Sequence, residues 1–517
     1  MYVSKKIGLQ KKRKSKKIIK AGNPVIKYNG IDIKPGTQFP NFADLRYAGL
    51  IESELSRANF NLADLSFAYL MRANLSHANL ESTNLTFSNF EGADLRFADL
   101  RFAKLVNTNF KGADLTNSLL SNAVFSYNVD LTNTKLISAD LRNIQIILDD
   151  TYGKPNIDLN KADLTNANLS NVYLINTNLT DANLTNANLS GVRCVNVNLK
   201  GSKLINTNLT RANLTNCIFE NVASLNIIGY PILSDNYKIV SGYIIGPNVN
   251  LMGANLRGAN LSSVNLTGAD LTGADLTGAD LTGADLTHCI LRDVLSSSII
   301  GKAILPINYK IVDGFLIGPY VNLVNTNLSH IDLIDCDLTG SDLTGAYLLY
   351  TNLTNSIITH CKLKSITSSN IIGKPILPTH YKLLNGYIIG PDVNLKNANL
   401  VNFDLTFSNL KNANLSDADL TGANLSDANL INANLTGADL TGVDLTGADL
   451  TDTDLTGADL TNVIGISLFK KVLYKTIWTK PRESLDKHVD SDGIITYSDN
   501  KGNYYNEHGT LLYGGSK

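Results

Sequence analysis

The sequence has few of the residues on which catalytic and metal sites depend. It contains one Trp, three Met and five Cys in 517 residues. The cysteines are Cys194, Cys217, Cys289, Cys336 and Cys361. They are scattered, with no C-x-x-C pair or metal-ligand spacing. The sequence also lacks H-E-x-x-H, P-loop, G-x-S-x-G and dinucleotide-binding glycine motifs. We therefore predict no catalytic residues, no cofactor and no metal, and expect that the protein is not an enzyme.

Long apolar runs are also missing. No segment approaches the roughly 18 apolar residues of a membrane-spanning helix. The N-terminus is basic, but no apolar segment follows it, as one would in a secretory signal peptide. These absences predict an intracellular protein, cytoplasmic by default, with no membrane partner.

The formal net charge of -1 conceals a strong polarity along the chain. Residues 1–40 hold eleven Lys/Arg and one acid, whereas residues 41–463 hold 26 bases and 39 acids. The basic run contains Lys5, Lys6, Lys11, Lys12, Arg13, Lys14, Lys16, Lys17 and Lys20. Such a run predicts contact with nucleic acid or nuclear import. The alternative is a disordered, solvated arm or one docked on an acidic neighbour. No aromatic residues interleave the run as in many single-strand binders.

An apolar residue recurs every five positions from Leu45 onward. Leu45, Leu50, Leu55 and Phe60 begin the series, and a small residue such as Ala43 precedes each of them by two positions. We name the pentad positions small, middle, centre, first turn and corner, in chain order. The middle position is most often Asn or Asp. The centres form blocks at 45–125, 131–146, 159–219, 251–291, 323–363 and 395–460, which amount to 66 pentads.

A period of five fits neither the 3.6 of a helix nor the 2.0 of an ordinary strand. It fits a coil in which each pentad makes one short side and one corner. The small and centre residues are two apart, so they point to the same face of an extended chain. That face must be the interior, because it alone is consistently apolar. No single coil buries its own centres, so stability has to come from stacked neighbours.

The stretch Ala269-Asp270-Leu271-Thr272-Gly273, repeated through Leu286, resembles the A-(D/N)-L-x-x signature of the pentapeptide-repeat family. The resemblance covers about two thirds of the chain. It implies an all-β fold, a right-handed quadrilateral parallel β-helix with four pentads per coil. Some family members resemble duplex DNA in shape and charge and occupy DNA-binding enzymes such as topoisomerases. The abundance of Asn, Ile and Lys is similar to members from bacteria and large DNA viruses, which makes a nuclear or virion-associated location the alternative to the cytoplasm.

The repeat is interrupted three times in a related way, at intervals of 72 residues between Gly229, Gly301 and Gly373. Each insert has two short apolar segments around a two-residue turn: Ser241-Gly242, Asp313-Gly314 or Asn385-Gly386. Such turns predict β-hairpins. We expect the hairpins to cover sheet edges or to join stacked segments, the alternative being ligand-binding loops. Residues 151–155 resemble a shortened insert, and the extra residue between Phe125 and Leu131 predicts a bulge or corner loop.

The C-terminal region departs from the repeat. Ile466, Phe469, Val472, Leu473 and Ile477 recur at helical spacing, which predicts a helix that caps the solenoid; the alternative is a basic amphipathic helix on a membrane surface. The following polar segment predicts a small β-hairpin. The predicted organisation is a basic arm (1–40), repeat blocks (41–146, 159–223, 251–295, 323–367, 395–463), a short insert (147–158), hairpin inserts (224–250, 296–322, 368–394), a capping helix (464–480) and a polar tail (481–517).

The register predicts where reactive side chains point. Four cysteines take the small position and Cys194 a centre, so all five are expected to be buried. His77, His288, His330 and His360 follow a centre by two positions and are expected to face outward. Asp270, Asp275, Asp280 and Asp285 fall on different walls, whereas Asp439 and Asp459 are expected to stack on successive coils as solvated acids. The sequence therefore favours a rigid scaffold for protein partners. The alternative is a nucleic-acid role, through mimicry of DNA by the acidic column or tethering by the basic arm.

Overall fold

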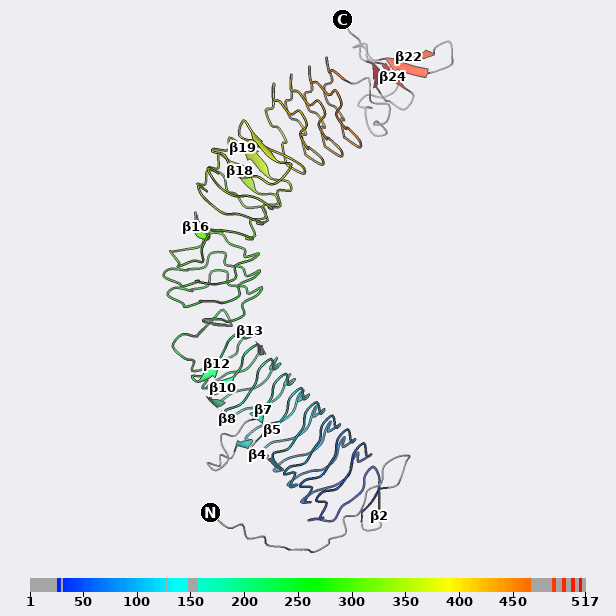
Figure 1. The fold of residues 1–517 in the computed structure, drawn as a ribbon, viewed down its shortest axis with the longest axis vertical. Coiled ribbons are helices and arrows are strands. Elements are labelled where there is room, and N and C mark those ends of the chain that lie inside the picture. Colours follow the sequence, from blue (N-terminus) through cyan, green and yellow to red (C-terminus); the bar gives the residue numbers. More distant parts are fainter. Residues whose placement is uncertain are drawn as a thin grey trace, which may run out of the picture. The chain divides into compact units, whose positions relative to one another are not determined.

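The computed structural model describes residues 26–28, 31–126, 128–146 and 157–465, together with four strands between residues 486 and 513. The described residues contain strands and turns but no helix, and hence no helix long and apolar enough to cross a membrane. The chain divides into two compact units. Unit 1 comprises residues 1–251 and 265–270, and unit 2 comprises residues 252–264 and 271–517. Stacked coils make up most of both units (Figure 1).

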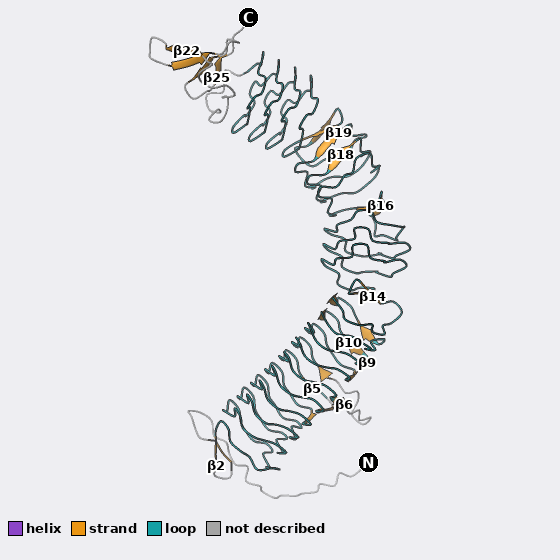
Figure 2. Ribbon diagram, turned by 180° about the vertical axis from the view of Figure 1, so that it is seen from behind, coloured by secondary structure: helices purple, strands orange, loops and turns teal. Residues whose placement is uncertain are grey.

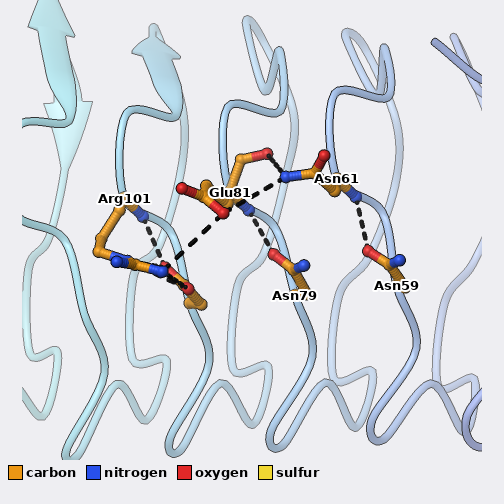
Figure 3. Close-up of polar contacts among 6 residues, drawn as sticks. Asn59, Asn61, Asn79, Glu81 and Arg101 are labelled. Carbon is orange, nitrogen blue, oxygen red and sulfur yellow. Dashed lines mark hydrogen bonds and ion pairs between the residues drawn. The ribbon is translucent and has the colours of Figure 1, made fainter. Parts of the chain in front are cut away.

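Each pentad folds as the five-residue period predicts. Small and centre side chains point inward, and Leu75, Leu184 and Leu276 have no exposed surface. The middle Asn or Asp accepts the N–H of the residue two positions later: the N–H groups of Asn61 and Glu81 donate to Asn59 and Asn79 Oδ1 at 3.0 Å (Figure 3). This turn explains why Asn and Asp recur there. The corner residue then takes a positive φ, which closes each side of the coil.

Successive coils pair in parallel at an offset of twenty residues, which confirms four pentads per coil. The N–H of Leu45 donates to Asp64 O (2.8 Å), and the N–H of Asp64 donates to Ala43 O (3.0 Å). The centre residue thus donates its N–H to the following coil, and the middle residue donates its N–H to the preceding coil. The quadrilateral parallel β-helix predicted from the sequence is confirmed. Most wall segments are single bridges, so Figure 2 shows them as loops.

The longer strands fall into three groups. The parallel wall strands are β3 (Lys104–Val106), β4 (Val124–Ser126), β5 (Val129–Asp130), β6 (Gln145–Ile146), β7 (Ile157–Asp158), β8 (Tyr173–Ile175), β9 (Arg193–Val195), β10 (Val197–Asn198), β11 (Lys203–Ile205), β12 (Cys217–Ile218), β13 (Ala223–Leu225), β18 (Tyr347–Leu349) and β19 (Thr367–Ser369). The hairpins are β1 (Ile26–Tyr28) with β2 (Ile31–Ile33), β14 (Lys238–Val240) with β15 (Tyr243–Ile245), β16 (Lys310–Val312) with β17 (Phe315–Ile317), and β20 (Lys382–Leu384) with β21 (Tyr387–Ile389). The tail strands are β22 (Asp486–Val489), β23 (Ile495–Ser498), β24 (Tyr504–Asn506) and β25 (Leu511–Tyr513).

The coils continue through every interruption by becoming longer. The extra residue after Phe125 produces a pairing offset of 21 residues, between Asn109 and Asp130. Around the short insert the offset is 28 residues, from Val129 to Ile157. At the three hairpin inserts the pairs are Ala223–Asn250, Leu295–Asn322 and Thr367–Asn394, each 27 residues apart. An insert is therefore an enlarged coil, and the wall resumes on its far side.

The predicted hairpins are confirmed, and each sends one strand into the solenoid core. Ser224, Ser296 and Ser368 take the centre position where other pentads have a large apolar residue. Their hydroxyls accept the N–H groups of Ile244, Leu316 and Ile388, at 2.8, 2.9 and 2.9 Å. These three apolar residues have no exposed surface. Serine thus leaves room for a second strand and satisfies its backbone donor.

The C-terminal region only partly matches the prediction. Ile464 forms a parallel bridge with Asp444, so the solenoid extends to the start of the predicted capping helix. The rest of that helix, from residue 466, lies outside the described residues. The tail holds more strands than the predicted hairpin, because β22–β25 form a four-stranded antiparallel sheet. The pairing of β23 with β24 matches the predicted hairpin. The sequence of β22 is Asp-Lys-His-Val, which lacks the apolar alternation from which a strand is predicted.

Candidate interaction surfaces

The outer walls carry rows of side chains that hydrogen-bond from coil to coil. Asn188 Nδ2 donates to Asn168 Oδ1 at 3.3 Å, and Asn208 Nδ2 donates to Asn188 Oδ1 at 3.2 Å. Figure 3 shows a related row, in which Asn61 Nδ2 donates to Glu81 O at 3.2 Å and Arg101 lies 3.8 Å from the Glu81 carboxylate. These contacts make the rows part of the fold and leave few polar groups to converge on a substrate.

The carboxylates are arranged for solvent exposure and turn capping. Hydrogen bonds from the hydroxyl and N–H of Thr446 hold the pKa of Asp444 below its usual range, and Thr451 does the same for Asp449. The pKa is likewise lowered for Asp94, Asp140, Asp275, Asp280, Asp342, Asp404 and Asp419. A general acid at neutral pH needs the opposite shift. Asp439 and Asp459 pair on successive coils, as the sequence predicts.

The cysteines and histidines lie where the register places them. All five cysteines are buried thiols. Contact with Cys194 and burial raise the pKa of Cys217, and burial raises the pKa of Cys361 to about 12, so both stay protonated thiols at neutral pH. His77 stacks on Phe97 at 4.8 Å between ring centroids. In the described part of the chain, no three His, Cys, Asp or Glu side chains are grouped closely enough to hold a metal ion.

The basic residues predicted to contact nucleic acid, Lys5 to Lys20, all lie outside the described residues. Their role therefore stays a prediction from the sequence.

The first surface that the sequence analysis missed is a pair of exposed isoleucines in each insert. The pairs are Ile228 and Ile232, Ile300 and Ile304, and Ile372 and Ile376. Between 52% and 60% of each residue is exposed. Ile228 is bonded like a middle residue, since its N–H donates to Thr207 O and its carbonyl accepts the Leu209 N–H. Its side chain therefore points outward where most pentads have Asn or Asp.

The second missed surface consists of aromatic residues at corners. Phe42, Tyr47, Phe67, Phe87, Phe97 and Phe102 have φ between 58° and 62° and are exposed by 37–76%. A left-handed conformation costs a bulky residue about 1–2 kcal/mol. Asn and Gly avoid most of this cost, and they occupy corners such as Asn107, Gly112 and Asn117 in the same unit. The signal in the sequence was the aromatic residue at the corner position.

Four-sided coils of pentads, with an apolar core and outward Asn and Asp, define a parallel β-solenoid built from five-residue repeats. The family model for pentapeptide repeats matches residues 41–144, 157–223, 250–293, 322–359 and 392–462, more than half of the chain. The chain therefore belongs to the pentapeptide-repeat family.

Solved structures of several pentapeptide-repeat proteins are similar to parts of the chain. HetL, involved in heterocyst differentiation regulation in the cyanobacterium Nostoc, is 26% identical, with 50% of this chain and 89% of HetL covered and a TM-score of 0.23. QnrB1, a plasmid-mediated fluoroquinolone resistance protein, is 16% identical, with 39% and 91% covered and a TM-score of 0.28. A protein of the Arabidopsis thaliana thylakoid lumen is 22% identical, with 28% and 69% covered and a TM-score of 0.11. No curated protein matches significantly.

Proposed function

We propose that the protein is a non-enzymatic scaffold whose solenoid walls bind protein partners, with the three inserts as the principal docking sites. The observation that carries this proposal is the recurrence of exposed isoleucine pairs every 72 residues. Exposed apolar side chains gathered at one place favour protein contacts. Asn at position 228 could make the same backbone contacts as Ile228, because Asn208 makes them on the same wall. The isoleucines are therefore better explained by binding than by folding.

Within unit 2, the two inserts present their isoleucines on neighbouring walls. The pair Leu295–Asn322 carries one wall across the second insert. Two pentads after Leu295 the chain reaches Ile304, and two pentads after Asn322 it reaches Asp332, so these residues lie on a common wall. On that wall Asp332 pairs with Asn352, which pairs with Ile372. The first isoleucine of the third insert thus shares a wall with the second isoleucine of the preceding insert. One flat partner cannot contact both pairs equally, which favours separate partner copies.

We expect Ile300→Asn with Ile304→Asn to remove one docking site while leaving the coil intact, because Asn fits the middle position. Proteins captured from the native source by wild-type chain would be compared with those captured by this variant and by the matching variants of the other two inserts. Leu119→Asn, at an exposed middle position in a coil away from the hairpin inserts, is the control. A partner that uses the inserts should show a severalfold lower capture by the double variants and unchanged capture by the control.

Once such a partner is purified, a titration should give more than one copy per chain and one copy fewer for each double variant. Equal capture by wild type and all three double variants would contradict the docking role of the inserts.

A second candidate is mimicry of DNA by an acidic wall. Asp419, Asp439 and Asp459 pair in series on successive coils, which places carboxylates at about 4.8 Å intervals. A column of negative charge can compete with nucleic acid for a basic groove. On another wall, the series Asn394, Asn414 and Asn434 is neutral, which limits the likeness to one side. Unchanged topoisomerase activity at micromolar concentrations of the protein would exclude mimicry toward topoisomerases.

A further inference from the structure

One centre position of unit 1 holds a cysteine where a large apolar residue is the rule. Cys194, in β9, is the sole member of the 66 block centres that is not Leu, Ile or Phe. The serines at the inserts are small because a hairpin strand enters the core beside them. Cys194 lies instead in an ordinary coil, since Arg193 pairs with Asn213 twenty residues later. Room for a second strand therefore does not explain the small residue at position 194.

The neighbour of Cys194 on the following coil is a second cysteine. Elsewhere in the column, a small side chain reaches the centre residue 23 positions earlier: Thr207 Oγ1 donates to Leu184 O at 3.0 Å. Cys217, in β12, takes this small position relative to Cys194. The two thiols are in hydrogen-bonding contact, and only 5% of Cys194 and 9% of Cys217 are exposed. The fold thus brings together two sulfur atoms from successive coils.

Cys361 shows the same small position without a second cysteine. Its Sγ donates to Leu338 O at 3.0 Å, again over 23 positions, but the centre residue is a leucine. Because no other block centre is a cysteine, this relation joins two thiols once in the repeat blocks. Cys361 is also buried, so it is the matched comparison for any reactivity that depends on the pair.

We propose that Cys194 and Cys217 are an oxidative modification site, at which a hydroperoxide converts the two thiols into a disulfide that links successive coils. A hydroperoxide such as hydrogen peroxide is small enough to reach the part of Cys217 that remains exposed. The second thiol is already in contact with the first, so the intermediate can be captured without a rearrangement of the coils. This modification is separate from partner docking at the inserts.

The reaction proceeds in two steps. The Cys217 thiolate attacks one oxygen of hydrogen peroxide, the O–O bond breaks, and the leaving hydroxide takes up the proton lost by the thiol. The products are a sulfenic acid on Cys217 and one water. The Cys194 sulfur then attacks the Cys217 sulfur, the S–O bond breaks, and the leaving hydroxide takes the Cys194 proton as a second water. The two thiols lose two electrons in total, and the peroxide is reduced to two waters.

Peptide mapping of the folded, reduced full chain after peroxide treatment tests the proposal. Oxidation with hydrogen peroxide on the order of 1 mM at about pH 9 raises the reactive thiolate fraction. The chain is then unfolded in N-ethylmaleimide, which blocks the remaining thiols, and digested with trypsin. Cleavage at Lys and Arg places the two cysteines in separate peptides, 194–200 and 212–238. We expect these two peptides to be joined by a bond that dithiothreitol cleaves, while the other cysteines carry the alkyl group.

Two variants separate the pair from general cysteine oxidation. Cys194→Leu restores the usual centre residue and leaves Cys217 over a leucine, as Cys361 lies over Leu338, so Cys217 should then remain a thiol. Cys361→Ala should leave the linkage unchanged. Oxidation of Met252, which is 57% exposed, shows that peroxide has acted on the protein.

Three outcomes overturn the proposal. The first is that Cys194 and Cys217 are still thiols when Met252 has been oxidised. The second is that the two residues become separate sulfinic acids without a link between their peptides. The third is that links to other cysteines form in equal yield, or that Cys361→Ala abolishes the link. Loss of partner capture at the inserts affects none of these outcomes.

Discussion

Replacing Ser296 with leucine, the usual residue at a centre position, should destabilise unit 2 by about 2–6 kcal/mol. The Ser296 hydroxyl accepts the N–H of Leu316 at 2.9 Å, and both residues are buried. Leucine would leave that donor without its acceptor, which costs about 1–3 kcal/mol. Its branched end would also extend into the space of β17, and such overpacking costs about 1–3 kcal/mol more. Unfolding in guanidinium, followed by circular dichroism, measures the total.

Hydrogen exchange localises the effect. Solenoids unfold in parts, so faster exchange should begin at residues 296–322 and spread to the adjoining coils. Ser296→Ala is the control: it removes the acceptor without filling the space and should cost only about 1–3 kcal/mol. A leucine variant more stable than wild type would show that the hairpin strand does not occupy this part of the core.

Gly301→Ala should destabilise unit 2 by about 2–4 kcal/mol, from the backbone conformation and from a steric contact. Gly301 has φ of 83°, which costs alanine about 1 kcal/mol. In addition, a Cβ at this position would lie 2.7 Å from the Cα of Thr282 on the coil below. That atom belongs to the backbone and cannot rotate away, so the insert must shift. The same close approach occurs at Gly229 over Thr210 and at Gly373 over Thr354.

Gly273→Ala separates the cost of the backbone conformation from the cost of the steric contact. Gly273 has a similar φ of 68°, but the nearest atom to an added Cβ is Gly253 N at 4.0 Å. We therefore expect a loss of only about 1 kcal/mol for Gly273→Ala, measured by the same denaturant unfolding. Equal losses for the two substitutions would mean that backbone conformation alone, and not the close approach to Thr282, makes glycine necessary at residue 301.

The sequence predicted few of the candidate interaction surfaces. Apolar residues usually predict burial, so the sequence did not mark Ile228 and Ile232 as exposed. Their exposure follows from bridges to Asn208 and Asn213 on the coil below, which fix the side chains outward. The stacking of Tyr47, Phe67 and Phe87 was implicit in the twenty-residue coil, but their left-handed conformation identifies them as unusual. The basic arm, the clearest site in the sequence, lies outside the described residues.

The five-residue period by itself determined which side chains face the core and where the cysteines and histidines point, whereas the four pentads per coil were implied by the resemblance to the pentapeptide-repeat family. These features are local, because residues two apart in an extended chain share a face wherever the coil goes. Only the tertiary structure decided how the inserts join the column. Ser296 resembles any small residue until Leu316, twenty residues later, returns to donate its N–H and enter the core. That contact depends on two segments meeting in space, which no periodicity within either segment encodes.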